Sequence, residues 1–212
     1  MCQKKGVIFD LDGTLWNSSE QVVPAWNTVL RRYPELNKQI TVEEMSSFFG
    51  KTLEDIASMM LPNIEKTGRL RILKECCKEE QVYLREHGGV LYPQLEETLA
   101  ELKKHYSLYI VSNCQNGYVD AFLDHHNLRS YFEDYEMSGR TGKSKGSNIR
   151  LIIERNGLDK AVYVGDTTGD VKGALEAGIP FIYAEYGFGE VSDIRYSISD
   201  ICELPTKLRE IL

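Results

Sequence analysis

The sequence contains no long hydrophobic run. Its apolar stretches fall far short of the about 18 residues that a membrane-spanning helix needs, and the first of them, Val7-Ile8-Phe9, ends at Asp10. The N-terminus carries two lysines but no apolar segment with a small-residue cleavage site, so it does not resemble a secretory signal. We therefore expect a cytoplasmic protein that has no membrane partner.

The cysteines of the chain are odd in number and scattered, and basic residues are fewer than acidic ones. None of its five cysteines forms a Cys-x-x-Cys pair, which disfavours a disulfide framework or a zinc site. The 25 basic and 32 acidic side chains give a net charge of −7, which argues against a broad nucleic-acid surface. A local basic or metal-containing pocket would still accept an anionic small molecule. The sequence leaves the oligomeric state open.

What the sequence does contain is an alternation of short strands and helices. Four runs are hydrophobic on both faces, which is typical of strands buried in a parallel sheet. They cover residues 6–10, 108–112, 161–166 and 179–184, and a weaker strand is expected at 135–138. Helical patterns lie between them, and a closing helix is expected at 204–212. The alternation predicts an α/β fold with a parallel sheet.

Residues 17–91 interrupt this alternation with helical signals alone. Thr41-x-x-Glu44 and Thr52-x-x-Asp55 are typical of helix starts. A longer helix is expected from about residue 69 to Gly88. A helical block inserted after the first strand predicts a lid over that strand's carboxyl end, where open parallel sheets place their sites. The expected domains are an α/β core, residues 1–16 and 92–212, and a cap, residues 17–91.

Polar residues that could form a site follow three of the predicted strands. These residues are Asp10, Asp12 and Thr14 after the first, Ser112 and Asn113 after the second, and Asp166 and Asp170 after the third, with Lys143 and Lys145 in a further loop. All these loops emerge at one edge of a parallel sheet. Carboxylates brought together repel one another unless a cation is bound, and all-oxygen ligands favour Mg²⁺. A magnesium ion, a lysine and hydroxyl donors suit a phosphoryl group, and an aspartate can be its nucleophile.

These residues resemble the four motifs of the haloacid dehalogenase-like superfamily. Asp10-Leu11-Asp12-Gly13-Thr14-Leu15, Ser112-Asn113, a loop lysine and Gly165-Asp166-x-x-x-Asp170 stand in the order of those motifs. The helical insertion resembles the superfamily's C1-type cap. The resemblance implies a Rossmann-like core with an inserted all-helical cap, and it is closest to the phosphoglycolate phosphatase-like and β-phosphoglucomutase-like members.

The resemblance also implies roles by position. Asp10 would be the nucleophile and a metal ligand, Asp12 the general acid/base and a metal ligand through its carbonyl, and Asp166 the remaining Mg²⁺ ligand. The other roles fall to Ser112 and Asn113, which would hold the phosphoryl oxygens, to Asp170 and Thr14 as auxiliary groups, and to a lysine that would neutralise Asp10 and the phosphate. An acidic residue at position 12 favours phosphoryl transfer over carbon–halogen cleavage.

The identity of that lysine is not fixed by the pattern. The common motif is Lys-Pro before a helix, whereas residues 140–149 contain no proline. Lys145 is preferred because it lies at the expected helix start, and Lys143 is the alternative.

The function implied is a Mg²⁺-dependent phosphatase that hydrolyses a small phosphorylated metabolite. A phosphomutase of the β-phosphoglucomutase kind is the alternative, but the insertion has few basic side chains that could bind a sugar bisphosphate. The candidates are Arg31, Arg32, Lys51 and Lys66. A phospho-receiver domain would also cluster carboxylates and a lysine, yet it needs neither a lid nor an acid at Asp12.

Overall fold

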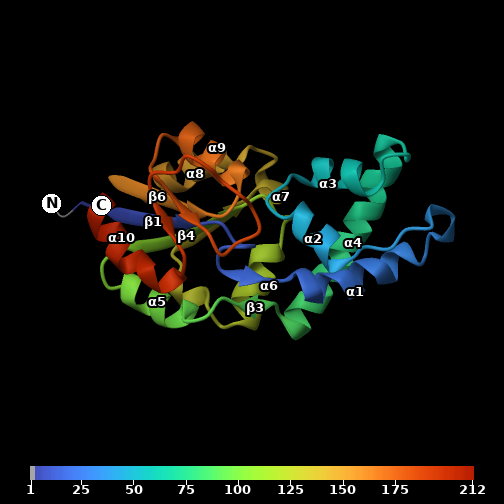
Figure 1. Cartoon of the computed structure of the whole chain (residues 1–212), viewed down its shortest axis with the longest axis horizontal. Coiled ribbons are helices and arrows are strands. Elements are labelled where there is room, and N and C mark those ends of the chain that lie inside the picture. Colours follow the sequence, from blue (N-terminus) through green and yellow to red (C-terminus); the bar gives the residue numbers. More distant parts are fainter. Residues whose placement is uncertain (1–2) are drawn as a thin grey trace.

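The computed structural model describes residues 3–212, and a six-stranded sheet forms its centre (Figure 1). The strands are β1 (Lys5–Phe9), β4 (Ser107–Ser112), β5 (Asp134–Met137), β6 (Lys160–Gly165), β7 (Phe181–Ala184) and β8 (Ser197–Ile198). Their order is β5-β4-β1-β6-β7-β8, and every neighbouring pair is parallel. The expected α/β fold is confirmed.

Helices cover both faces of this sheet, which explains why its strands carry hydrophobic side chains on both faces. On one face lie α5 (Leu95–Leu102), α6 (Tyr118–His125) and α10 (Leu204–Ile211), and on the other lie α8 (Lys145–Asn156) and α9 (Thr168–Ala177). In β1, Val7 and Phe9 belong to the core under the first group, while Ile8 packs with Ile149 and Ile152 under the second. All these side chains are fully buried.

Four helices of the insertion lie beyond the carboxyl ends of the strands. They are α1 (Ser19–Leu30), α2 (Val42–Phe48), α3 (Leu53–Met60) and α4 (Lys66–His87). The expected helix starts at Thr41 and Thr52 are confirmed, because each hydroxyl accepts a backbone N–H three residues on. The long helix begins at Lys66, earlier than expected, since Glu65 accepts the N–H groups of its first turn. It ends at Gly88, as expected.

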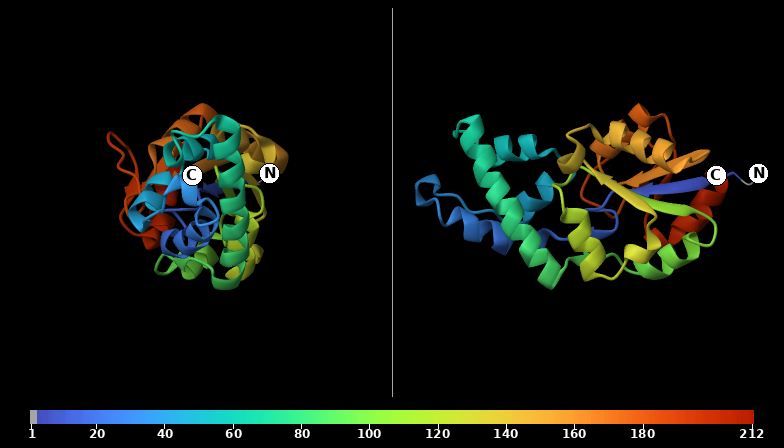
Figure 2. Two further views of the ribbon diagram at one scale, coloured as in Figure 1. Left: turned by 90° about the vertical axis from the view of Figure 1, so that its right-hand side faces the viewer. Right: turned by 180° about the vertical axis from the view of Figure 1, so that it is seen from behind.

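The short elements of the fold were not predicted from the sequence pattern. The expectation that residues 17–91 hold no strand is wrong: β2 (Trp16–Asn17) pairs antiparallel with β3 (Val90–Leu91). Two-residue strands carry no periodicity that would reveal them. Both lie where the chain enters and leaves the helical insertion (Figure 2). The other short elements are α7 (Ser138–Thr141), η1 (Pro34–Leu36), η2 (Arg129–Tyr131) and η3 (Ile201–Glu203).

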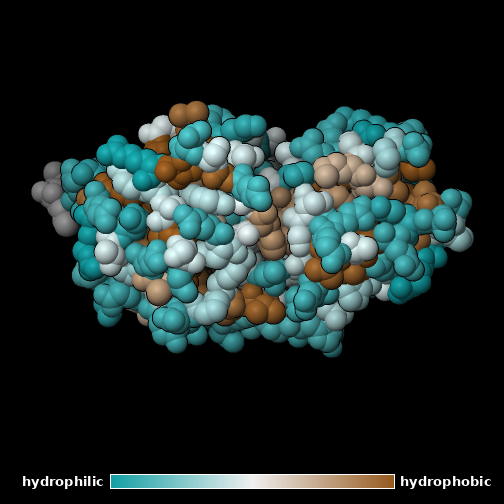
Figure 3. All heavy atoms as spheres, in the orientation of Figure 1, coloured by the Kyte–Doolittle hydropathy of each residue, from teal (hydrophilic) through white to brown (hydrophobic). Residues whose placement is uncertain are grey.

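The surface carries scattered hydrophobic residues rather than one large apolar patch on the face shown in Figure 3. The exposed large hydrophobic side chains belong to both parts of the molecule, and they are Val42, Met59, Val82, Val90 and Leu175. Within residues 3–212, no helix combines the length and the hydropathy needed to cross a bilayer.

Candidate active site

The polar residues expected to converge do so at the carboxyl edge of the central strands. Asp10 follows β1, Ser112 ends β4, and Asp166 follows β6. These strands are neighbours in the sheet, with β1 between β4 and β6. The fourth component, Lys145, begins α8. Parallel pairing therefore brings side chains from four distant loops to one place.

Three buried carboxylates form the centre of the site. Asp10, Asp166 and Asp170 each offer an oxygen within 4.8 Å of the others, and their exposed fractions are 1%, 0% and 0%. Lys145 is equally buried and its ammonium nitrogen lies 3.0 Å from Asp10 Oδ1 in an ion pair. It forms a second, shorter ion pair with Asp170. Lys143, in contrast, is exposed, so the structure brings Lys145 into the cluster.

One oxygen of the cluster has a single charged neighbour. Asp10 Oδ1 is fully buried, and within residues 3–212 only the Lys145 ammonium, 3.0 Å away, lies close enough to donate to it. Burial, together with the Asp170 charge, raises the pKa of Asp10 to about 7, against the opposing effect of Lys145. Burial and the charges of Asp170 and Asp10 also hold the pKa of Asp166 well above its ordinary value. Three buried carboxylates that share one ammonium carry excess negative charge, which fits a bound cation.

Asp170 has a different environment, because its oxygens already have donors. Oδ2 accepts the Thr167 N–H at 2.8 Å, the Thr167 hydroxyl at 2.7 Å and the Asp166 N–H at 3.2 Å. Together, Thr167 and Asp170 form a capping box at the start of α9. This arrangement fixes the helix start and aims Asp170 at Lys145, which suits an auxiliary group.

Asp166 is enclosed by backbone and a hydroxyl. The Phe188 N–H donates to its Oδ2 at 2.7 Å, and Thr14 Oγ1 donates to Oδ1 at 3.4 Å. Gly13 approaches with φ +83°, and a Cβ there would overlap Asp166 Oδ2. Glycine is required because it adopts this φ without strain and leaves room for the carboxylate. The contact from Phe188 had no counterpart in the sequence pattern.

Asp12 is held by three side-chain donors on one oxygen. Its Oδ1 accepts the Trp16 indole N–H at 2.9 Å, the Ser18 hydroxyl at 3.1 Å and the Tyr118 hydroxyl at 2.8 Å. Burial raises the pKa of Asp12 to about 6, and the same three hydrogen bonds limit the rise. Sequence reasoning missed all three donors. Only the spacing of Ser18 and Trp16 from Asp12 could have hinted at them, since Tyr118 lies 106 residues away.

Ser112 and Asn113 take up distinct positions. Ser112 is buried beside the cluster, and its Oγ accepts the Cys114 N–H at 3.4 Å. The Asn113 side-chain amide donates to the Gly50 carbonyl at 2.9 Å and accepts the Ser138 hydroxyl at 2.9 Å. Asn113 thus ties the loop after β4 to the loop between α2 and α3.

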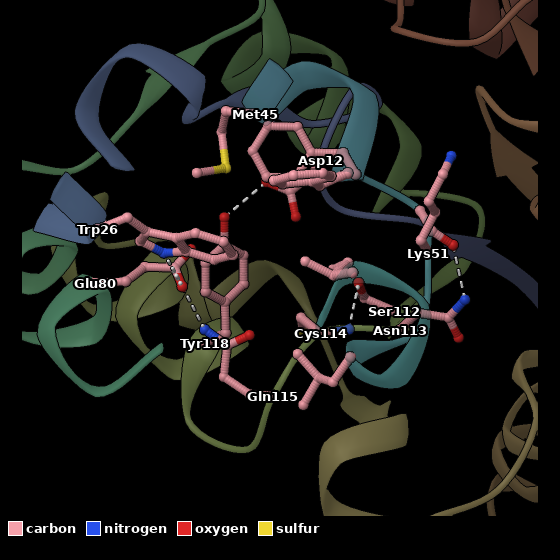
Figure 4. A pocket seen from close by; sticks show the side chains of 15 residues that line it. Asp12, Trp26, Met45, Lys51, Glu80, Ser112, Asn113, Cys114, Gln115 and Tyr118 are labelled. Carbon is pink, nitrogen blue, oxygen red and sulfur yellow. Dashed lines mark hydrogen bonds between the residues drawn. The ribbon is translucent and has the colours of Figure 1, made fainter. Parts of the chain in front are cut away.

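A cavity of about 40 Å³ lies between the inserted helices and this edge of the sheet (Figure 4). Asp12, Ser112 and Tyr118 line it from the sheet side. From the insertion come mainly hydrophobic residues, together with one buried acid: Trp26, Met45, Phe48, Phe49, Leu53, Ile56 and Glu80. Sequence reasoning did not single out Glu80.

The four cations considered in the insertion are placed differently. Arg32 pairs with Glu79 at 2.9 Å and Lys66 with Glu54 at 2.5 Å, while the Arg31 guanidinium donates to Thr28. Lys51 alone among them lines the cavity, and its side chain is exposed. Figure 4 shows it directed away from the centre of the cavity.

Comparison with known proteins decides the family. The model of the haloacid dehalogenase-like hydrolase family matches residues 7–184. The chain belongs to this family. This hydrolase is 28% identical over 214 residues to the phosphoglycolate phosphatase of Aliivibrio fischeri, and the alignment covers 93% of this chain and 91% of that one. It is 25% identical over 219 residues to the phosphoglycolate phosphatase of Escherichia coli, covering 90% and 85%.

Solved structures agree with this family. The crystal structure of a predicted phosphatase from Clostridium acetobutylicum aligns with a TM-score of 0.81 and 25% identity, covering 99% of this chain and 100% of that one. The family match and these relatives support a phosphatase, and they confirm the resemblance to the phosphoglycolate phosphatase-like members. A phospho-receiver domain is thereby set aside.

Proposed function

We propose that this hydrolase is a Mg²⁺-dependent phosphatase that acts on a small phosphorylated metabolite through an aspartyl-phosphate. The observation that carries the proposal is the buried Asp10 carboxylate, which clusters with Asp166 and whose Oδ1 lies 3.0 Å from the Lys145 ammonium. A carboxylate oxygen held beside an ammonium suits a nucleophile toward an anionic phosphoryl group.

The donor set fits magnesium. Asp10 and Asp166 would hold the ion through carboxylate oxygens and Asp12 through its backbone carbonyl, all hard oxygen ligands. Asp170 would stay with Lys145 and Thr167, whose hydrogen bonds already occupy it. When bound, Mg²⁺ neutralises the charge of the carboxylates and of the phosphoryl oxygens.

The proposed reaction has two displacements at phosphorus. First, an Asp10 oxygen bonds to phosphorus while the bond to the alcohol oxygen breaks, and the Asp12 carboxyl donates its proton to that oxygen. Second, Asp12 takes a proton from water, the water oxygen bonds to phosphorus, and the bond to Asp10 breaks. Ser112, Asn113 and Lys145 would hold the phosphoryl oxygens throughout, and inorganic phosphate leaves.

The inserted helices, residues 17–91, would be the cap that excludes water from the core, residues 1–16 and 92–212. Hydrolysis is favoured over a phosphomutase reaction because the insertion offers few cations to hold a sugar bisphosphate. Of the four considered, only Lys51 lines the cavity. The four described cysteines are free, which fits the reducing cytoplasm that we propose for this reaction.

The test is phosphate release with Mg²⁺ from a panel of phosphate monoesters, comparing the wild type with Asp10→Asn. Loss of the nucleophile should lower kcat by about 10³-fold or more, and acid quenching should trap phosphorylated wild type but not the variant. Asp193→Asn, an exposed acid, is the matched control. Undiminished turnover in Asp10→Asn would refute the nucleophile. Isomerisation of glucose 1-phosphate without phosphate release would establish the mutase instead.

A further inference from the structure

A buried acidic side chain on the cap has no cationic partner. Glu80 lies on α4 with 3% of its surface exposed. Among residues 3–212, no lysine, arginine or histidine forms an ion pair with it. A buried carboxylate without a counter-ion is costly, so its retention calls for a reason.

The hydrogen bonds of Glu80 leave one oxygen open to the cavity. Oε2 accepts the Trp26 indole N–H at 3.1 Å and the Gln115 side-chain amide at 2.9 Å. No described side chain or backbone N–H donates to Oε1, and Glu80 lines the cavity (Figure 4). The two donors come from α1 and from the loop after β4, so they hold the carboxyl in a fixed orientation. Oε1 is then available to a ligand.

The rest of the cavity wall suits a small cation. Trp26 and Phe48 stack with centroids 6.1 Å apart, and Tyr118 adds a third aromatic ring to the lining. Aromatic faces attract ammonium groups within about 6 Å. Asp12 places a second carboxyl on the same cavity.

The geometry points to a substrate whose leaving group carries an ammonium: a phosphate monoester of a short amino alcohol, with its nitrogen between Glu80 Oε1 and the aromatic rings. This inference rests on the proposed phosphatase activity and adds the class of substrate. The cavity of about 40 Å³, room for roughly three water molecules, limits the leaving group to a few non-hydrogen atoms. An acidic leaving group such as glycolate would place a third carboxylate beside Glu80 and Asp12, with Lys51 directed elsewhere.

The experiment compares two nearly isosteric esters with the Mg²⁺-loaded enzyme at pH 8.5. Burial raises the pKa of Glu80 to about 8, so its carboxyl is ionised at this pH while an alkyl ammonium keeps its proton. 2-Aminoethyl phosphate carries an ammonium where n-propyl phosphate carries a methyl group, and 2-phosphoglycolate supplies the acidic leaving group. We expect kcat/KM for the aminoethyl ester to exceed that for each of the others by about thirtyfold or more, the loss typical of a buried charge pair broken on one side. Phosphate release from any of these three esters reports whether the enzyme hydrolyses phosphate monoesters at all.

Glu80→Gln removes the charge while keeping an oxygen for Trp26 and Gln115. The ratio of kcat/KM between the aminoethyl and propyl esters should fall to about 1 in this variant. The matched control is Glu79→Gln, the adjacent acid on α4, which pairs with Arg32 outside the cavity; it should keep the wild-type ratio. Urea unfolding verifies that both variants are folded.

The outcomes separate the two proposals. Turnover of the esters without a preference for the aminoethyl ester, or with a preference that survives Glu80→Gln, overturns the ammonium inference and leaves the phosphatase standing. A better rate with 2-phosphoglycolate also overturns it. If none of the esters is hydrolysed, the phosphatase proposal itself fails, and the substrate class with it.

Discussion

At the scale of single residues, the acid/base candidate depends on its hydrogen-bond donors. Three donors converge on one oxygen of Asp12, which fixes the carboxyl and leaves the other oxygen for chemistry. The Tyr118 hydroxyl also contacts Ser18 at 2.7 Å. Tyr118 is therefore a positioning residue that acts through Asp12 and Ser18 at once.

Tyr118→Phe should lower kcat about tenfold and change KM little, because the substrate's phosphate is held elsewhere while Asp12 gains freedom to rotate. Steady-state kinetics with the best ester of the panel measures this split. Tyr131→Phe, which removes an exposed hydroxyl bonded to Glu96, is the control and should match the wild type. A change confined to KM would contradict the positioning role.

Glu80 should make stability depend on pH. Burial raises its pKa from the ordinary 4.5 to about 8, with the Asp12 charge adding and the Trp26 and Gln115 bonds opposing. The contribution of the neutral Glu80 carboxyl to the free energy of unfolding is thus fully present below pH 4.5, and it is lost as the pH rises through 8. Relative to Glu80→Gln, the wild type should lose about 1.4 kcal/mol of unfolding free energy per pH unit within that window.

Urea unfolding of both proteins at pH 5, 6.5 and 8 tests this difference. The comparison cancels the other titrating groups, which the two proteins share. Parallel stability curves would show that Glu80 stays ionised in the folded protein.

At the scale of elements, the start of α9 connects helix stability to the site. Thr167 caps this helix and also donates to Asp170, the partner of Lys145. Thr167→Ala should cost about 1 kcal/mol of stability, as N-cap losses do, and should lower kcat as well. Asp200→Ala removes a comparable cap at η3 and should affect stability alone. Equal effects of both variants on kcat would disprove the connection.

The return from α4 to the core contains a tightly enclosed glycine. Gly88 has φ +66°, and a Cβ there would overlap the His125 ring. Gly88→Ala should destabilise the fold by about 2 kcal/mol or more, combining left-handed backbone strain with the clash. Gly157→Ala is the matched control, because Gly157 has φ +61° and no atom within 4 Å of such a Cβ. It should cost only about 1 kcal/mol in thermal or urea unfolding.

The elements also show what could be predicted from sequence and why. Strands such as β1 could be predicted because hydrophobic residues occupy both their odd and their even positions. The loops after them could be predicted from their polar residues. Glu80 could not be recognised, since its donors Trp26 and Gln115 lie 54 and 35 residues away and only the packed fold brings them together. The β2–β3 pair was missed because two residues show no period.

At the scale of the whole molecule, the acidic cluster should make folding depend on the metal. Mg²⁺ bound at Asp10 and Asp166 stabilises the native state alone, by about 2.7 kcal/mol at a hundred times its dissociation constant. EDTA should abolish turnover and lower the Tm, and Mg²⁺ should restore both. In Asp166→Asn the Tm should no longer respond to Mg²⁺. A Tm that is insensitive to Mg²⁺ in the wild type would argue against the metal site.

The net charge of −7 bears on the same experiment. Ionic strength screens the exposed charges over about 10 Å at 0.1 M salt, but it reaches the buried cluster far less. Added NaCl at matched ionic strength should therefore not reproduce the rise in Tm that Mg²⁺ gives, which separates specific binding from screening.

Ser18, the residue before α1, bonds the carboxyl of Asp12. This hydrogen bond constrains any exchange of the inserted helices for those of a relative. A chimera joined after residue 18 keeps this hydroxyl, whereas one joined after residue 16 inherits whatever the donor supplies. The junction at which the inserted helices can be exchanged without loss is therefore set by the Ser18 side chain, and it lies two residues beyond the point where the helical insertion begins.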